Sequence, residues 1–86
     1  MTKNTLILYS RDRCPLCDKA KNIIVELQEE WNFHFQIIDI AQSDELTEKY
    51  GLMIPVVELN GEEIQYGQID KFSIIEAFEE KSKSIL

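Results

Sequence analysis

The feature that most constrains the fold is a strand pattern followed at once by a helix pattern and a second strand pattern. Leu6 to Tyr9 form a continuous apolar run, which is typical of a strand covered on both faces. From Leu16 to Leu27 apolar residues recur at three- and four-residue steps, which predicts an amphipathic helix over about residues 15–30. Residues 33–40 predict a second strand. This order requires a crossover connection, so we expect a right-handed parallel βαβ unit.

A short helix and a hairpin are expected next. Ser43 can cap a helix that ends at Gly51. Residues 54–59 and 62–66 predict two strands, and the Asn60-Gly61 pair between them is the strongest short hairpin signal, because both turn positions need positive φ. An antiparallel hairpin therefore follows the parallel unit.

A last helix completes the chain. Asp70 can cap it, and we expect Phe72, Ile75 and Phe78 on its inner face, with fraying after Glu80. The element order is then β-α-β-α-β-β-α, with no linker and no internal repeat. This predicts one α/β sandwich over residues 1–86, with helices on both faces of the sheet.

The charge is unevenly distributed along the chain. The net charge is −7, yet residues 1–21 carry five basic and two acidic side chains, and the rest of the chain carries four basic and 14 acidic ones. An acidic body argues against nucleic acid and anionic membranes as partners. The longest apolar run near the N-terminus is too short for a signal-peptide core or a membrane span, so we expect a cytosolic protein.

The only two cysteines, Cys14 and Cys17, lie in the positive stretch as Cys-Pro-Leu-Cys. In a reducing cytosol such a pair points to catalysis, redox sensing or metal binding rather than to a structural staple. Zinc normally takes four ligands, and His34 is the sole further soft ligand in the sequence. A cluster shared between two chains is a weaker alternative than disulfide closure.

Cys14 is the expected nucleophile. Pro15 is well tolerated in a first helical turn, which puts Cys14 at the helix N-cap. Unpaired amide groups, the positive end of the helix dipole, and the guanidinium groups of Arg11 and Arg13 would all stabilise a thiolate there. Cysteines in such settings have pKa values of roughly 3.5–7.5. Cys17, one turn further on, would resolve the mixed disulfide that Cys14 forms.

By these residues the chain resembles the glutaredoxin-like branch of the thioredoxin superfamily along nearly its full length. The matching segments are LILYS before CPLC, MIPVVEL before the Asn60-Gly61 turn, and YGQID before the last helix. The resemblance implies a thioredoxin-like, three-layer α/β/α sandwich with a four-stranded mixed sheet. It also implies a thiol–disulfide oxidoreductase that takes part in cell redox homeostasis and electron transport.

The resemblance further implies a substrate- or glutathione-binding set. Pro55 would be preceded by a cis peptide bond and would face the dithiol, and the backbone of Ile54 would hydrogen-bond to the substrate. Arg11 would pair with a carboxylate. Gly67 and Asp70 would receive the γ-glutamyl end of glutathione, although Gln68 stands where the family has a second glycine, and Asp70 could simply cap the helix.

Two classes of function follow. The first is an enzyme, likewise implied by the resemblance, that reduces protein disulfides or glutathione mixed disulfides through Cys14 and Cys17. It would be a monomer without a tightly bound cofactor, with glutathione or thioredoxin reductase as electron donor. The second is a non-enzymatic binding or redox-sensing module, in which the acidic remainder of the chain is the interaction face.

Overall fold

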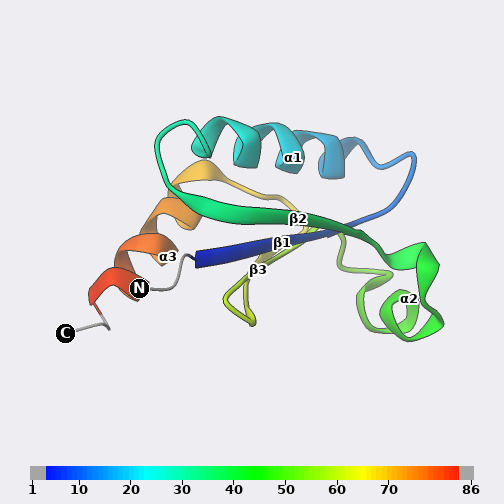
Figure 1. The fold of residues 1–86 in the computed structure, drawn as a ribbon. Coiled ribbons are helices and arrows are strands. Elements are labelled where there is room, and N and C mark those ends of the chain that lie inside the picture. Colours follow the sequence, from blue (N-terminus) through cyan, green and yellow to red (C-terminus); the bar gives the residue numbers. More distant parts are fainter. Residues whose placement is uncertain (1–3, 84–86) are drawn as a thin grey trace.

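A computed structural model of the protein describes residues 4–83, with side chains described for residues 4–80. Figure 1 shows the path of the chain. Its elements are β1 (Asn4–Ser10), α1 (Pro15–Leu27), β2 (Phe33–Asp39), the 3-10 helix η1 (Ile40–Gln42), α2 (Asp44–Tyr50), β3 (Val56–Leu59), β4 (Glu62–Tyr66) and α3 (Lys71–Lys83). Apart from η1, this is the expected order. None of the helices in the described part is long and apolar enough to cross a membrane.

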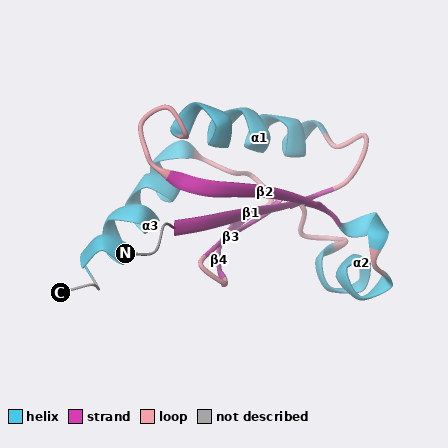
Figure 2. Cartoon of the chain, viewed as in Figure 1, coloured by secondary structure: helices cyan, strands magenta, loops and turns pink. Residues whose placement is uncertain are grey.

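One four-stranded sheet forms the centre of the molecule, in the order β2-β1-β3-β4. Strands β1 and β2 are parallel, whereas β3 is antiparallel to both β1 and β4. The sheet is therefore mixed, and the parallel unit followed by a hairpin is confirmed (Figure 2). Strand β1 lies between β2 and β3, and both of its faces are covered, since Leu6 and Leu8 pack in one cluster and Ile7 and Tyr9 in another; this explains its continuous apolar run.

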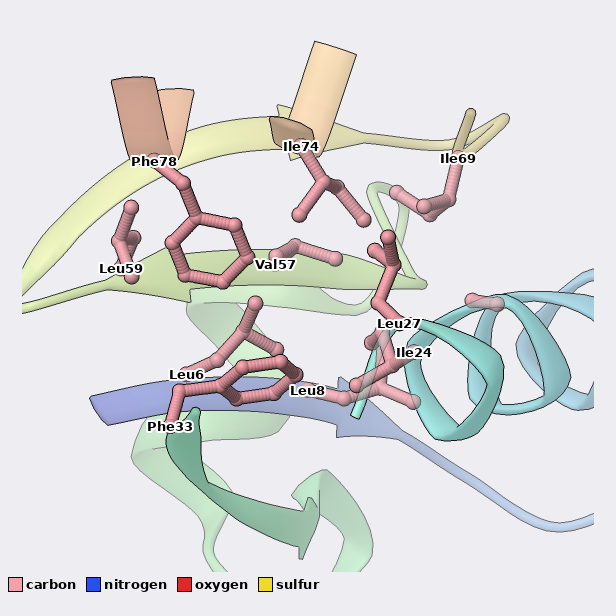
Figure 3. Packing of buried hydrophobic residues seen from close by; sticks show 11 residues of the cluster. Leu6, Leu8, Ile24, Leu27, Phe33, Val57, Leu59, Ile69, Ile74 and Phe78 are labelled. Atoms are coloured by element: carbon pink, nitrogen blue, oxygen red, sulfur yellow. The ribbon is translucent and has the colours of Figure 1, made fainter. Parts of the chain in front are cut away.

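Alternate side chains of the central strands point to opposite faces of the sheet and pack in two separate buried clusters. Leu6 and Leu8 of β1 pack in the larger cluster with buried residues of α1 and α3, among them Ile24 and Phe78. Figure 3 shows the α1 and α3 side chains converging on this face of the sheet. On the other face, Tyr9 joins Ile40, Tyr50 and Val56 of the smaller cluster. Two helices thus cover one face and α2 covers part of the other, which confirms the three-layer α/β/α architecture (Figure 1).

Helix α1 begins as its sequence predicts but ends early. Cys14 is its N-cap residue and Pro15 occupies its first turn. The helix ends at Leu27 rather than near residue 30, and residues 28–30 form a turn in which the Leu27 carbonyl accepts hydrogen bonds from the amides of Glu30 and Trp31. Amphipathic spacing specifies a helix interior well, whereas a frayed last turn leaves no periodic signal.

The hairpin turn matches its sequence signal. Asn60 and Gly61 both have positive φ, 52° and 86°. The Asn60 side chain also joins the turn to the start of β1, because its Oδ1 accepts a hydrogen bond from the Thr5 amide at 2.8 Å. Asn60 therefore supplies the turn and fixes its position against the neighbouring strand.

Residues 39–43 contain a short element that the sequence patterns do not reveal. Strand β2 ends at Asp39, and Ile40 starts η1 instead of continuing the strand. Asp39 caps this turn, with its Oδ1 accepting from the Ala41 amide at 2.9 Å, and Ser43 then caps α2. A single turn is too short to show periodicity, and only the capping residues indicate it.

Of the three residues expected on the inner face of helix α3, Ile75 and Phe78 pack against the core, whereas Phe72 does not. Phe72 is 78% exposed, whereas Ile74 and Phe78 are buried and Ile75 packs against the cluster. The Phe78 ring stacks on Trp31, with centroids 5.2 Å apart, and tilts against Phe33 at 5.0 Å. The helix also continues to Lys83 rather than fraying after Glu80, while residues 84–86 lie outside the described part.

The two phenylalanines of α3 provide a direct test of this packing. Phe78→Ala should lower the free energy of unfolding by about 3–5 kcal/mol, because a buried ring leaves a cavity. Phe72→Ala should change it by less than about 0.5 kcal/mol, because that ring lies in solvent. Urea denaturation followed by circular dichroism would measure both, and equal losses would contradict the observed orientation of α3.

Candidate functional site

The candidate site forms where β1 passes into α1. The strand ends at Ser10, and residues 11–14 turn the chain onto the first turn of the helix. Arg13 has φ of 57°, in the left-handed region, and Cys14 then adopts an extended conformation with φ of −122°. An extended N-cap directs its side chain back over the first turn. The local backbone therefore places the Cys14 sulfur at the start of α1.

Cys14 and Cys17 form a disulfide, with their Cα atoms 5.1 Å apart. This separation is within the usual range for bridged cysteines. The two cysteines differ in access, since Cys14 is half-buried and Cys17 is only 4% exposed. Helical spacing explains the difference, because position 17 belongs to the buried face of α1 together with Ala20 and Ile24. An incoming group can thus reach Cys14 more easily than Cys17.

The start of the helix also sets the electrostatics of Cys14. The Cys17 amide donates a hydrogen bond to Cys14 Sγ at 3.2 Å. This amide belongs to the first turn, where the helix has unpaired N–H groups and the positive end of its dipole. Backbone donors so placed would stabilise a thiolate on Cys14 once the disulfide is reduced.

Two arginines add positive charge beside the sulfur. Arg11 and Arg13 are exposed and line the same hollow as Cys14. Neither guanidinium makes a hydrogen bond or an ion pair within residues 4–80, where the ion pair present joins Lys71 to Glu26. Both charges are therefore available to a group that approaches Cys14.

The segment before β3 forms the opposite wall. The Ile54–Pro55 peptide bond is cis, as the resemblance implied. The amides of Met53 and Ile54 both donate to the Tyr50 carbonyl, at 2.9 and 3.1 Å. The Gly67 amide donates to the Pro55 carbonyl at 2.8 Å and so ties this segment to the end of β4. The Ile54 N–H is already engaged, so an added substrate strand would have to use the Ile54 carbonyl or displace that bond.

Between these walls lies a hollow of about 380 Å³. It is lined by Arg11, Arg13, Cys14, Pro15, Leu16, Gly51, Leu52 and Ile54. A second hollow, of about 290 Å³, opens on the side of β2 and reaches Cys17, with Asp39 and Lys21 on its wall. Both arginines line both hollows, so they stand between the approaches to the two sulfurs.

Metal binding finds no support in the described part of the chain. No group of three or more histidine, cysteine or carboxylate residues there could hold a metal ion. His34 is exposed and pairs with Thr5 near the start of β1, at the other end of that strand from the loop to Cys14. It therefore cannot complete a zinc site with the two cysteines.

The chain matches a known family over most of its length. Residues 5–79 match the family described as "Glutaredoxin-like domain (DUF836)". The chain belongs to this family. A curated relative, a thioredoxin from Methanocaldococcus jannaschii, is 25% identical over 84 residues, which cover 94% of this chain and 99% of the relative.

Solved structures resemble the fold of this glutaredoxin-like protein. Protein Ne2328 from Nitrosomonas europaea superimposes with a TM-score of 0.78 at 24% identity, covering 90% of this chain and 93% of that one. Protein XcR50 from X. campestris has a TM-score of 0.73 at 28% identity, covering 86% and 95%. A mutant thioredoxin from Halobacterium salinarum has a TM-score of 0.70 at 21% identity, covering 92% and 74%. The fold is thus thioredoxin-like.

The residues expected to bind glutathione are only partly brought together. Arg11 and Ile54 line the hollow beside Cys14, whereas Pro55, which is fully buried, Gly67 and Asp70 do not. Gly67 has φ of 78°, which suits glycine, and connects to the Pro55 loop. Asp70 directly precedes α3, where its carboxylate accepts from the Phe72 amide at 3.0 Å and the Ser73 hydroxyl at 2.6 Å. It serves as a helix cap, and its ligand role stays a prediction.

Sequence reasoning misses two residues of this hollow. The spacing of Leu16 predicts that it lies on the buried face of α1, but it is 44% exposed, and no pattern singles out Leu52 although it is fully exposed. For Leu16 the available signal is Cys17, which takes the buried position of the first turn. For Leu52 the available signal is its position between Gly51 and Pro55, because an apolar residue there belongs to no predicted strand or helix.

The capping role of Asp70 predicts a pH dependence of stability. The hydrogen bond from Ser73, with further bonds from the Phe72 amide and Gln65, lowers the pKa of Asp70. Because the pKa of Asp70 is lower in the folded than in the unfolded protein, its ionised form stabilises the fold. This stability is fully present above the pKa of the unfolded state, near 3.9, and is lost as the pH falls through the pKa of the folded state. Asp70→Ala should therefore lower the melting temperature at pH 7, and the gap from wild type should narrow below about pH 4. A gap that is constant with pH would contradict this.

The backbone at Arg13 predicts a gain in stability on substitution. A non-glycine residue in the left-handed region costs roughly 1–2 kcal/mol, which a glycine variant would avoid. Glycine also makes the unfolded chain more flexible, and this entropy would cancel part of the gain. Arg13→Gly should raise the free energy of unfolding by about 0.5–1 kcal/mol, whereas Arg11→Gly should not raise it. Urea denaturation of the oxidised proteins would decide, and a less stable Arg13→Gly variant would contradict the strain.

Proposed function

We propose that this protein is a thiol–disulfide oxidoreductase in which Cys14 is the nucleophile and Cys17 the resolving cysteine. The observation that carries the proposal is the Cys14–Cys17 disulfide at the start of α1, with Cys14 accessible and Cys17 buried. Membership of the glutaredoxin-like family and a thioredoxin relative support a redox role in general.

The chemistry follows from the order of access. In the reduced protein the Cys14 thiolate attacks one sulfur of a substrate disulfide, and the other substrate sulfur leaves as a thiolate. Cys17 then loses its proton and attacks Cys14 Sγ. The mixed disulfide breaks, the second substrate thiolate leaves, and the Cys14–Cys17 disulfide forms. Two electrons pass from the protein to the substrate, which becomes two thiols.

Local groups support each step. The Cys17 amide at 3.2 Å from Cys14 Sγ, the helix dipole and the charges of Arg11 and Arg13 favour an ionised attacking sulfur. The short Cα–Cα distance allows resolution without movement of the helix. A reducing compartment such as the cytosol would return the pair to the dithiol between turnovers.

The electron donor divides the proposal into two versions. Glutathione would use Arg11 for a carboxylate and, if the family site is preserved, Gly67 and Asp70 for its γ-glutamyl end. Thioredoxin reductase would instead contact the accessible disulfide as a protein partner. No tightly bound cofactor is required in either version. Offering each donor separately to the oxidised protein, and counting the thiols restored, would distinguish the two.

The alternative is a binding or redox-sensing module in which the dithiol does not turn over. It predicts an unactivated Cys14, because a scaffold has no need of a thiolate. Alkylation of the reduced protein with iodoacetamide across about pH 5–10, followed by mass spectrometry, would separate the two. Oxidoreductase function requires the midpoint for Cys14 to lie below about pH 7.5, and a midpoint near 8.5 would favour the module.

Two cysteine variants test the assigned roles. Cys14→Ser should lower the rate of insulin disulfide reduction, measured with dithiothreitol as donor, to the rate of dithiothreitol alone. In the absence of dithiothreitol or any other thiol, the reduced Cys17→Ser protein should react once and stop as a mixed disulfide on Cys14, visible as a mass adduct, because the resolving sulfur is missing. A Cys14→Ser protein that kept its turnover would disprove the assignment.

A further inference from the structure

Two exposed leucines flank the accessible sulfur. Leu16, in the first turn of α1, is 44% exposed, and Leu52, just after α2, is fully exposed. Both line the hollow that contains Cys14, although they come from different segments of the chain. Single exposed leucines are ordinary on a protein surface. Two that line the same reactive hollow can instead pack against an apolar side chain of a partner.

The lining of the same hollow is also cationic. Arg11 and Arg13 line it without any hydrogen bond or ion pair to the described residues. The protein as a whole is acidic, with a net charge of −7 and only nine lysines and arginines. In such a chain, two unpaired guanidinium groups beside the accessible sulfur are complementary to an anionic group on whatever approaches it.

The backbone of Arg13 supports a role for its side chain. Its φ of 57° is a conformation that glycine or asparagine would adopt at lower cost. Unfavourable backbone conformations cluster at binding and active sites, where the side chain is needed for function. Arg13 immediately precedes Cys14, so its guanidinium is placed at the edge of the hollow that an incoming disulfide must enter.

We infer that the preferred substrates are polypeptide disulfides with an acidic and an apolar side chain close to the cysteine. Arg13 receives the carboxylate, and Leu52 together with Leu16 packs against the apolar side chain. This inference rests on the proposed function and specifies its substrate class. The hollow of about 380 Å³ is at the small end of ligand sites, so it accommodates a short segment of chain. Glutathione disulfide offers carboxylates but no large apolar side chain, and is the poorer substrate.

Three synthetic disulfide-linked peptide dimers can test this preference. They share one sequence around a single cysteine and differ at two neighbouring positions, which hold Glu and Leu, Lys and Leu, or Glu and Ser. Reduced protein is mixed with each dimer in the absence of other thiols, and released peptide thiol is quantified by acid quenching and chromatography. The Glu–Leu dimer should react about three- to tenfold faster than either of the others. The advantage over the Lys–Leu dimer should shrink in about 1 M salt.

Variants assign the two contacts. Arg13→Gln should remove the preference for glutamate over lysine, whereas Arg13→Lys should keep most of it. Leu52→Ser should remove the preference for leucine over serine. Val25→Ser is the matched control, because Val25 is 47% exposed on α1 and does not line the hollow. Leu52 lies fully in solvent, so its substitution should leave folding intact.

The outcomes separate this inference from the proposed function. Equal rates for the three dimers, or a Leu52→Ser protein that behaves like Val25→Ser, would overturn the substrate preference while leaving the oxidoreductase function in place. The oxidoreductase function itself would be overturned if the wild-type protein reduced none of the three dimers and also failed to reduce a small aromatic disulfide. Preference for glutathione disulfide over the Glu–Leu dimer would also reject the inference.

Discussion

The candidate site depends on one local interaction, the contact between Cys14 Sγ and the Cys17 amide at the start of α1. It forms because β1 ends four residues before the helix and Cys14 takes the N-cap position with an extended backbone. The same helical start separates the two cysteines by three residues, which brings them together and gives them unequal exposure. The start of α1 thus accounts for three properties of the site. It places amide donors that would stabilise a Cys14 thiolate, it lets the Cys14–Cys17 disulfide close, and it leaves Cys14 more exposed than Cys17.

The two walls of the site are supported by different clusters. Helix α1 packs on the larger cluster, whereas the Pro55 segment is held from the smaller one through Tyr50. The Tyr50 carbonyl accepts the amides of Met53 and Ile54, and its ring lies 4.6 Å from that of Tyr9. Burial raises the pKa of Tyr50, so the ring stays neutral within this cluster at physiological pH. The width of the hollow thus depends on both faces of the sheet.

Most of the fold could be predicted because its signals are local. The apolar run of β1, the spacing of α1 and the Asn60-Gly61 turn each act through neighbouring residues, and the cysteine pair identified the candidate site. Some errors concern where elements end, as at the last turn of α1, at η1 and at the end of α3, and others concern which residues of a first helical turn are buried. Phe72 and Leu16 both continue an apolar spacing, but each lies in a first turn and is exposed. Periodicity cannot show where the neighbouring layer ends, so it predicts burial for exposed apolar residues near the site.

The charge distribution of the chain limits the distance over which the site could attract an acidic partner. Apart from residues 1–21, the chain carries 14 acidic side chains against four basic ones, so an acidic partner meets net repulsion from afar. Physiological salt screens charges beyond about 8 Å, which limits this repulsion to surfaces that come close. Arg11 and Arg13 line the hollow that contains Cys14, so an acidic segment that enters it meets positive charge next to the sulfur. For the substrates inferred above, repulsion from the acidic body and attraction to the two arginines would together favour an approach at Cys14.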